Sequence, residues 1–269
     1  MFDLAAITLT LKALGRGKTP RWLGRATHAW FLDIVRDIHP SYSKILHDTD
    51  TMKPFTVSSL LGARVRGNRL EFKQDDEVRL RITTLHPQLT LILLNQILPW
   101  MHCRTVNIHG QSFEVTNIET GGDWSGCTTF DTLLKTVEHQ RRELTLNFLT
   151  PTTFKRTGDY FDAIPYPDLV FGSLLDRWNA FSPVLMPRDV EAVLGSRVAV
   201  YRHQTDSEIL RLGGAHFRRP IPVFSGKVRF RLIEDDRILR RFVHVLAAYA
   251  KYSGIGYRTT MGLGQARVQ

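Results

Sequence analysis

The chain has 269 residues, 43% of them hydrophobic and 10% aromatic, and these proportions exclude an intrinsically disordered polymer. No apolar run reaches the roughly 18 residues of a membrane span, the amino terminus lacks the basic region of a signal peptide, and two cysteines are too few for a disulfide framework. We therefore expect a soluble cytoplasmic protein. Its 36 Lys and Arg residues exceed the 26 Asp and Glu residues by ten, which favours a polyanionic partner.

The first half of the chain alternates extended segments with two helices. Residues 2–14 alternate apolar and polar side chains and predict a half-buried strand, which the Gly- and Pro-containing residues 15–20 end. Thr27 is the expected N-cap of a helix that ends near Pro40. The next predicted elements are a polar loop over 40–54, a strand over 55–61, extended segments over 69–85, a helix over 87–98 and an extended segment over 105–118. This β-α-β-β-α-β order is the signature of a ferredoxin-like domain.

The second half repeats that order. We expect one domain over residues 1–122, a connection over 123–140 and a second domain over 141–269. The elements predicted for the second domain are a strand over 143–150, a helix over 168–180, extended segments over 197–212 and 221–233, a helix over 236–252 and a strand over 263–268. The predicted fold class is therefore α+β, with two tandem ferredoxin-like (RRM-like) domains that each carry helices on one face of an antiparallel sheet.

The positive charge is concentrated in the second half of the chain. Residues 1–134 carry 15 cations and 13 acids, whereas residues 135–269 carry 21 and 13. Over residues 227–232 cations alternate with apolar side chains, so a strand would project Lys227, Arg229 and Arg231 from one face. Such a face suits the phosphates of RNA. The other cations assigned to this surface are Lys155, Arg156, Arg218 and Arg219.

A glycine segment, residues 254–264, separates the last predicted helix from the last strand. It contains Gly254, Gly256, Gly262 and Gly264, with Arg258 in the middle. Glycine allows backbone N–H groups to approach a phosphate closely, so these five residues are candidates for RNA binding. A tight turn that simply needs small residues is the alternative.

The glycine segment also resembles a known family. Gly-Ile-Gly, five residues and Gly-Leu-Gly resemble the hallmark loop of the RAMP superfamily of CRISPR systems. Residues 149–156 and 171–179 are similar to the start of the second domain in CRISPR precursor-RNA processing endoribonucleases. The resemblance implies metal-independent cleavage within CRISPR repeat RNA that leaves a 5′-hydroxyl and a 2′,3′-cyclic phosphate, with no cofactor.

The resemblance also directs the choice of catalytic residues. His47 lies in a Leu-His-Asp sequence at the place where family members carry a catalytic histidine, and a histidine suits proton transfer near neutral pH. Lys53 and Arg25 would stabilise charge on the phosphate. His28 is the main rival of His47, and Tyr42 is a candidate for positioning the 2′-hydroxyl. The structural alternative for His47 is a loop histidine or a helix-end cap.

Two other functions stay open at this point. A non-catalytic RAMP subunit would bind crRNA within a CRISPR effector complex without cutting it. A metal-dependent phosphohydrolase would use His47 and Asp48, although no further set of ligands is evident and no metal site is predicted. The expected partner is CRISPR repeat RNA, either as a hairpin or single-stranded. A CRISPR effector complex and a homodimer are possible assemblies, and no membrane association is expected.

Overall fold

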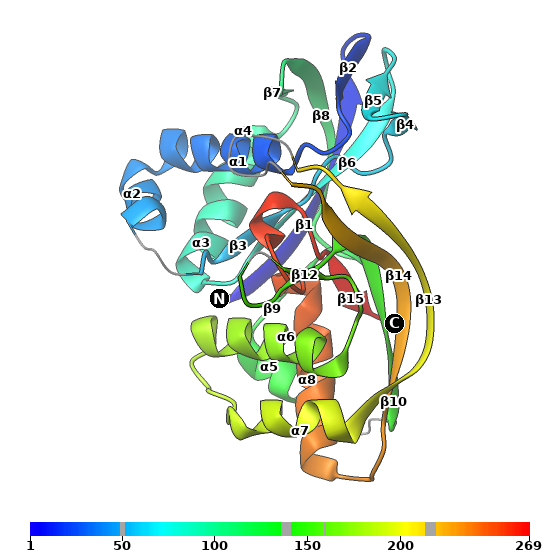
Figure 1. Cartoon of the computed structure of the whole chain (residues 1–269). Helices are drawn as coiled ribbons and strands as arrows, with labels where there is room; N and C mark the ends of the chain where they lie inside the picture. Colours follow the sequence, from blue (N-terminus) through cyan, green and yellow to red (C-terminus); the bar gives the residue numbers. More distant parts are fainter. Residues whose placement is uncertain (49–51, 136–140, 159, 213–218) are drawn as a thin grey trace. The chain divides into compact units, whose positions relative to one another are not determined.

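The computed structural model describes the chain except for residues 49–51, 136–140, 159 and 213–218, and it divides into two compact units (Figure 1). Of the described residues, unit 1 comprises Met1–Cys127, Leu212 and Thr260–Gly262. Unit 2 comprises Thr128–Arg211, Arg219–Thr259 and Leu263–Gln269. In the described part of the chain, none of the helices combines the length and the apolar character needed to cross a bilayer.

Unit 1 is built around a mainly antiparallel sheet. Its strands are β1 (Leu4–Ala13), β2 (Gly17–Pro20), β3 (Phe55–Val57), β4 (Arg64–Arg66), β5 (Arg69–Phe72), β6 (Glu77–Thr84), β7 (Thr105–Ile108), β8 (Gln111–Glu119) and, at its border, β9 (Gly126–Thr128). Its helices are α1 (Gly24–Ile38), α2 (Pro40–Asp48), α3 (Pro87–Ile92), the π-helical η1 (Leu93–Ile97) and α4 (Leu98–Met101). The main sheet has the order β3-β6-β1-β8-β7, and β2, β5 and β4 form a separate three-stranded sheet.

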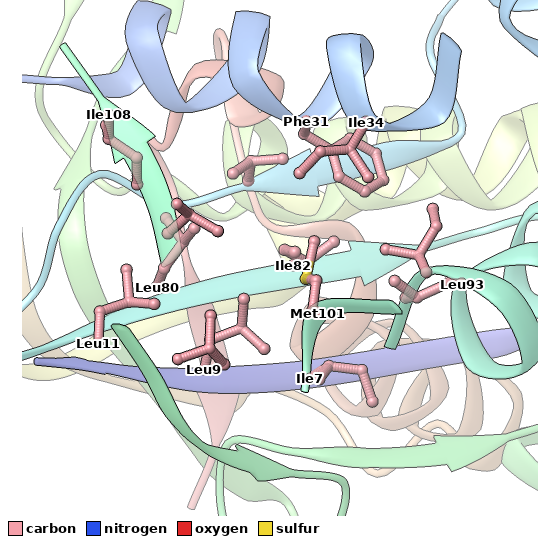
Figure 2. Packing of buried hydrophobic residues seen from close by; sticks show 14 of the residues in the cluster. Ile7, Leu9, Leu11, Phe31, Ile34, Leu80, Ile82, Leu93, Met101 and Ile108 are labelled. Carbon is pink, nitrogen blue, oxygen red and sulfur yellow. The ribbon is translucent and has the colours of Figure 1, made fainter. Parts of the chain in front are cut away.

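One face of the main sheet carries the hydrophobic core of unit 1. Every second residue of β1 faces the helices, and the register places Ile7 opposite Ile82 and Leu9 opposite Leu80. Figure 2 shows these side chains beneath Phe31 of α1, with the helices over one face of the sheet. Burial of this cluster fixes which face of β1 points inward, because a register slip of one residue would expose it.

The opposite face of β1 is covered over its first half, at Ala6 and Thr8, which differs from the predicted half-buried strand. Thr8 is only 7% exposed, and the Ser125 hydroxyl donates a hydrogen bond of 2.8 Å to its Oγ1. Beside it, Arg81 is buried, and its Nε donates to the carbonyl of Trp124 at 2.8 Å. The residues that lead into β9 therefore close this face with polar contacts.

Three local predictions in unit 1 are wrong. Residues 15–20, predicted only to end the first strand, include the strand β2, which pairs with β5. Thr27 lies inside α1, where its hydroxyl donates to the Gly24 carbonyl, and Leu23 is the N-cap residue. The predicted polar loop over 40–54 begins with the helix α2, in which the buried Tyr42 and Leu46 lie one turn apart and pack on the core.

Unit 2 has core elements in the same β-α-β-β-α-β order as those of unit 1. Its elements are α5 (Phe130–Lys135), β10 (Glu143–Thr152), β11 (Phe154–Lys155), β12 (Phe161–Asp162), α6 (Pro167–Phe181), α7 (Asp189–Arg197), β13 (Val198–Leu210), β14 (Ile221–Leu232), α8 (Arg237–Ser253) and β15 (Ala266–Val268). The sheet order is β13-β14-β10-β15. It matches β3-β6-β1-β8 of unit 1 position by position, which confirms the prediction of two tandem ferredoxin-like folds.

Helices α6 and α8 form the core of unit 2 with the inner face of this sheet. The Trp178 ring of α6 packs against Phe130 of α5 and Tyr249 of α8, with ring centroids 5.2 and 5.3 Å apart. Phe171 of α6 meets Phe230 of β14 at 5.2 Å. The side chains of β14 at residues 227, 229 and 231 point away from this core and are exposed, and these are the predicted cations.

Candidate functional site

The carboxyl end of α2 carries His47, the predicted catalytic residue, in the last helical turn. Pro40 occupies the first position of this helix, where its fixed φ suits helix entry. Because Leu46 is buried in the core of unit 1, the backbone of this last turn is held against the unit. The side chain of His47 lies outside the described residues, and so does the segment 49–51 that follows the helix.

Lys53 is linked to the same turn. Its ammonium group donates a hydrogen bond to the main-chain carbonyl of Leu46, the residue before His47. Lys53 itself is half-buried just before β3. A charged donor on a carbonyl of the last helical turn is favourable, because the carbonyls there have no partner within the helix. The bond therefore places a cation beside the backbone that carries His47.

The start of α1 carries two more of the predicted residues, Arg25 and His28. Arg25 is exposed in its first turn. The His28 ring stacks on Phe55 at 5.4 Å, and its Nδ1 lies 2.9 Å from the carbonyl oxygen of Thr260, which also belongs to unit 1. A carbonyl only accepts, so Nδ1 carries the proton of this bond, and in the neutral ring Nε2 holds the lone pair. His28 is thus held in one orientation by contacts that a structural residue would make.

Tyr42 does not fit the role predicted for it. Its side chain is 4% exposed within the core of unit 1, and burial raises its pKa to about 12. A phenol in this position packs against the ring of His39 and is withdrawn from solvent, where a ribose would have to bind. We therefore leave Tyr42 out of the catalytic proposal.

The glycine segment is a tightly hydrogen-bonded turn. Positive φ angles occur at Gly254, Gly256, Gly262 and Gly264, as well as at Arg258. A Cβ on Gly264 would lie 1.8 Å from the carbonyl oxygen of Ile255, and a Cβ on Gly256 would lie 2.5 Å from that of Thr153. Both approaches are shorter than any side chain tolerates, so the backbone itself requires glycine at these two positions.

Five backbone N–H groups of this segment have acceptors within unit 2. Gly256 donates to Ser173 Oγ at 2.7 Å, Ile255 and Gly264 donate to main-chain carbonyls at 2.8 and 2.9 Å, and Gly254 and Tyr257 do the same at 3.0 and 2.9 Å. In this structure these five N–H groups are therefore engaged by protein acceptors, and a role of the segment in RNA binding stays a prediction. Arg258, whose guanidinium lies 5.1 Å from the centre of the Tyr257 ring, is the charged side chain of the segment.

The alternating cations of β14 point outward as predicted. Lys227, Arg229 and Arg231 are exposed, whereas the apolar residues between them are buried. Glu143 of β10 lies opposite Arg231 and forms ion pairs with Arg231 and, at 3.8 Å, with Arg229. This acid was not anticipated, and it offsets one of the three positive charges.

The outer face of β13 extends this surface with residues that the sequence analysis missed. Arg202 lies opposite Arg229 in the register. Tyr201, 52% exposed at an irregularity of the strand, has the Arg231 guanidinium stacked 3.9 Å from its ring centre. The sequence signal for this face of β13 was weak, because the irregularity shifts the alternation of inward and outward side chains by one residue.

Three of the other predicted cations lie at separate places in unit 2. Lys155 is exposed at the end of β11, and Arg156 forms an ion pair of 3.4 Å with Asp162. Arg219 is exposed just before β14. Arg218 lies outside the described residues.

Comparison with known proteins gives matches in both halves of the chain. A model described as the CRISPR Cas6 N-terminal domain matches residues 9–98, and one described as CRISPR-associated endoribonuclease Cas6 matches residues 146–266. The second match includes the whole glycine segment and the basic strand β14.

Individual relatives agree with these models. The chain is 25% identical over 134 residues to the CRISPR-associated endoribonuclease Cas6 of Streptococcus thermophilus, which covers 49% of this chain and 53% of the relative. It is 30% identical over 131 residues to that of Mycobacterium tuberculosis, covering 48% and 40%. The chain thus aligns with about half the length of these curated relatives. A solved Cas6 product complex is 26% identical, with a TM-score of 0.78 and 99% of both chains covered.

Proposed function

The chain belongs to the Cas6 family of CRISPR-associated endoribonucleases, and on that basis we propose that it binds CRISPR repeat RNA and cleaves precursor crRNA. In the proposed reaction the ribose 2′-hydroxyl attacks the adjacent phosphorus and loses its proton to a base. The bond to the 5′-oxygen breaks, and that oxygen takes a proton from an acid. The products are a 2′,3′-cyclic phosphate and a 5′-hydroxyl, and the reaction needs no metal ion.

We assign the proton transfer to His47 and charge stabilisation to Lys53 and Arg25. The observation that supports this most directly is the hydrogen bond from Lys53 to the Leu46 carbonyl, because it holds a cation at the turn that carries His47. A cation there would offset the charge that develops on the phosphate oxygens. The contacts of His28 with Thr260 and Phe55 favour a structural role for that residue.

We expect cleavage of labelled repeat RNA to proceed in EDTA and to stop when the nucleotide before the cleaved bond lacks its 2′-hydroxyl. Removing that hydroxyl removes the nucleophile, whereas removing divalent ions leaves the proposed residues unchanged. Denaturing gels and end-group analysis would measure both results. RNA binding without cleavage would instead support the alternative of a non-catalytic RAMP subunit, and cleavage that requires a divalent ion would support the phosphohydrolase.

For substrate binding we propose the outer face of β14, with Lys155, Arg156, Arg219 and Arg258 as further contacts. Simultaneous replacement of Lys227, Arg229 and Arg231 with alanine is expected to lower the salt dependence of RNA affinity, by about 2 in the slope of log K against log salt, since each phosphate contact with a single strand contributes about 0.7. Fluorescence anisotropy at several salt concentrations would measure the slope.

The matched control for this variant removes three other cations of unit 2, two of them exposed and one half-buried. Arg188, Arg197 and Arg240 form ion pairs with Asp176, Asp236 and Asp235 around the helices of unit 2. The triple alanine variant of these residues, the helix-side control, has the same net charge as the β14 variant. Equal slopes in the two variants would refute a specific role for the β14 face.

A further inference from the structure

The three-stranded sheet of unit 1 presents a second row of cations. Its order is β2-β5-β4, and the register places Lys18 and Arg64 on either side of Glu71, and Arg66 opposite Arg69. Because side chains alternate along a strand, these five side chains share one face. The sequence analysis missed this cluster, since the charges of residues 1–134 nearly cancel when counted together.

The other face of this sheet attaches it to unit 1. Leu70 and Phe72 of β5 are 3% exposed, and the ring of Phe72 meets that of Phe113 in β8 at 5.4 Å. The charged face is directed away from this packing, and the residues of β4 on it are exposed, with 79% exposure for the Arg66 side chain. Figure 1 shows the sheet projecting beyond the end of β1. The orientation of the charged face is thus fixed by a buried apolar anchor.

The cations of this face outnumber its acids by four to one. Glu71 forms ion pairs with Lys18 at 2.9 Å and with Arg66 at 3.8 Å. The hydrogen bond from Lys18, together with the positive charges of Lys18, Arg66 and Arg64, lowers the pKa of the Glu71 carboxyl. Among the described residues, Arg64 and Arg69 form no ion pair with a carboxylate. The face therefore keeps a net charge of three after its internal pairing.

We propose that this face, formed by Lys18, Arg64, Arg66 and Arg69, is a second RNA-binding surface that contacts the phosphate backbone; the inference rests on the proposed function. Guanidinium groups match phosphate oxygens in bidentate geometry, which supports an RNA backbone as the ligand. Phe72 is the one aromatic residue of the three strands, and it is buried, so bases have no ring to stack on here. The surface would therefore hold RNA without reading its sequence.

A different role for the same cations is protection of the sheet edges. β2 and β4 are the edge strands, and charged side chains at an edge discourage pairing with another chain. The two roles predict different behaviour. If the cations protect the edge strands, their removal causes the protein to self-associate. If they bind phosphates, their removal weakens RNA binding without self-association.

Replacement of Arg64, Arg66 and Arg69 together with alanine is expected to lower the salt slope of RNA affinity by about 2 relative to the helix-side control, and to raise Kd about 10- to 100-fold near 0.1 M salt. The factor should be the same for repeat RNA and for a scrambled RNA of equal length. The triple lysine variant at these positions should retain most of the affinity. Glu71→Gln, which removes the one acid of the face, should increase the affinity and the slope.

Anisotropy titrations at four salt concentrations, with size-exclusion chromatography of each variant, would decide the matter. A triple alanine variant with the slope and Kd of the helix-side control overturns the inference, and so does a loss of affinity confined to repeat RNA or accompanied by self-association. If wild-type protein neither binds nor cleaves repeat RNA, the proposed function itself has failed. If wild-type protein cleaves repeat RNA and the triple alanine variant of Arg64, Arg66 and Arg69 binds RNA like the helix-side control, the proposed function stands and only the second RNA-binding surface is refuted.

Discussion

Replacing His47 with alanine is expected to lower the single-turnover rate constant of RNA cleavage by about 10²- to 10⁴-fold, the usual contribution of a positioned general acid or base. The Kd for RNA should stay close to that of the wild type, because binding is assigned to cationic surfaces elsewhere. Quenched-flow or manual sampling with protein in excess over labelled RNA would measure the rate constant. Partial recovery of the rate with added imidazole would identify proton transfer as the lost step.

Two further histidine variants make this result specific. His102→Ala changes an exposed histidine that follows α4 and serves as the matched control. His28→Ala removes the contacts with Thr260 and Phe55, so we expect this variant to have a lower melting temperature than the wild type. The melting temperature of His47→Ala should equal that of the wild type. A fully active His47→Ala protein would refute the assignment and make His28 the catalytic candidate.

Gly264→Ala is expected to destabilise the protein by more than about 3 kcal/mol, or to prevent folding. The left-handed φ of +69° costs an L-residue about 1–2 kcal/mol, and the Cβ would also meet the Ile255 carbonyl at 1.8 Å, which only a backbone shift can relieve. That shift would break the hydrogen bond from Ile255 N to the Gly264 carbonyl. Urea unfolding followed by circular dichroism would measure the free energy of unfolding.

Two other glycines separate the contributions to this effect. Gly110 has a φ of +81° but open space around its Cβ position, so its alanine variant should lose only about 1 kcal/mol. Gly15 has neither a positive φ nor a close neighbour, and its alanine variant should be as stable as the wild type. A Gly264→Ala protein as stable as Gly110→Ala would show that the turn adapts at no cost.

The major elements could be predicted because each has a long periodic signal. The alternation of residues 227–232 gave the correct inward and outward faces of β14, and the stripe of apolar residues over 236–252 located α8. Helix α2 was missed because its apolar face rests on a single pair of residues, Tyr42 and Leu46, within a polar stretch. A signal that short cannot be distinguished from a loop.

The remaining differences come from contacts between distant parts of the chain. Ser125 lies 117 residues from Thr8, so nothing local indicates that it covers the second face of β1. The strands of the three-stranded sheet have three or four residues each, and only their pairing brings Lys18 and Arg64 to the same face. For the catalytic proposal, the family resemblance suggested His47, and the Lys53 hydrogen bond could be found only in the folded chain.

The close packing around the glycine segment changes what its motif can diagnose. Gly256 and Gly264 are required by distances between backbone atoms, which any chain with this turn has to satisfy whether or not it reacts with RNA. Natural selection would therefore retain these glycines in proteins that have lost catalysis, and the motif would identify binders and nucleases alike. The residues that distinguish the two groups should instead be sought at the end of α2, because no such approach between backbone atoms requires a particular side chain at His47 or Lys53.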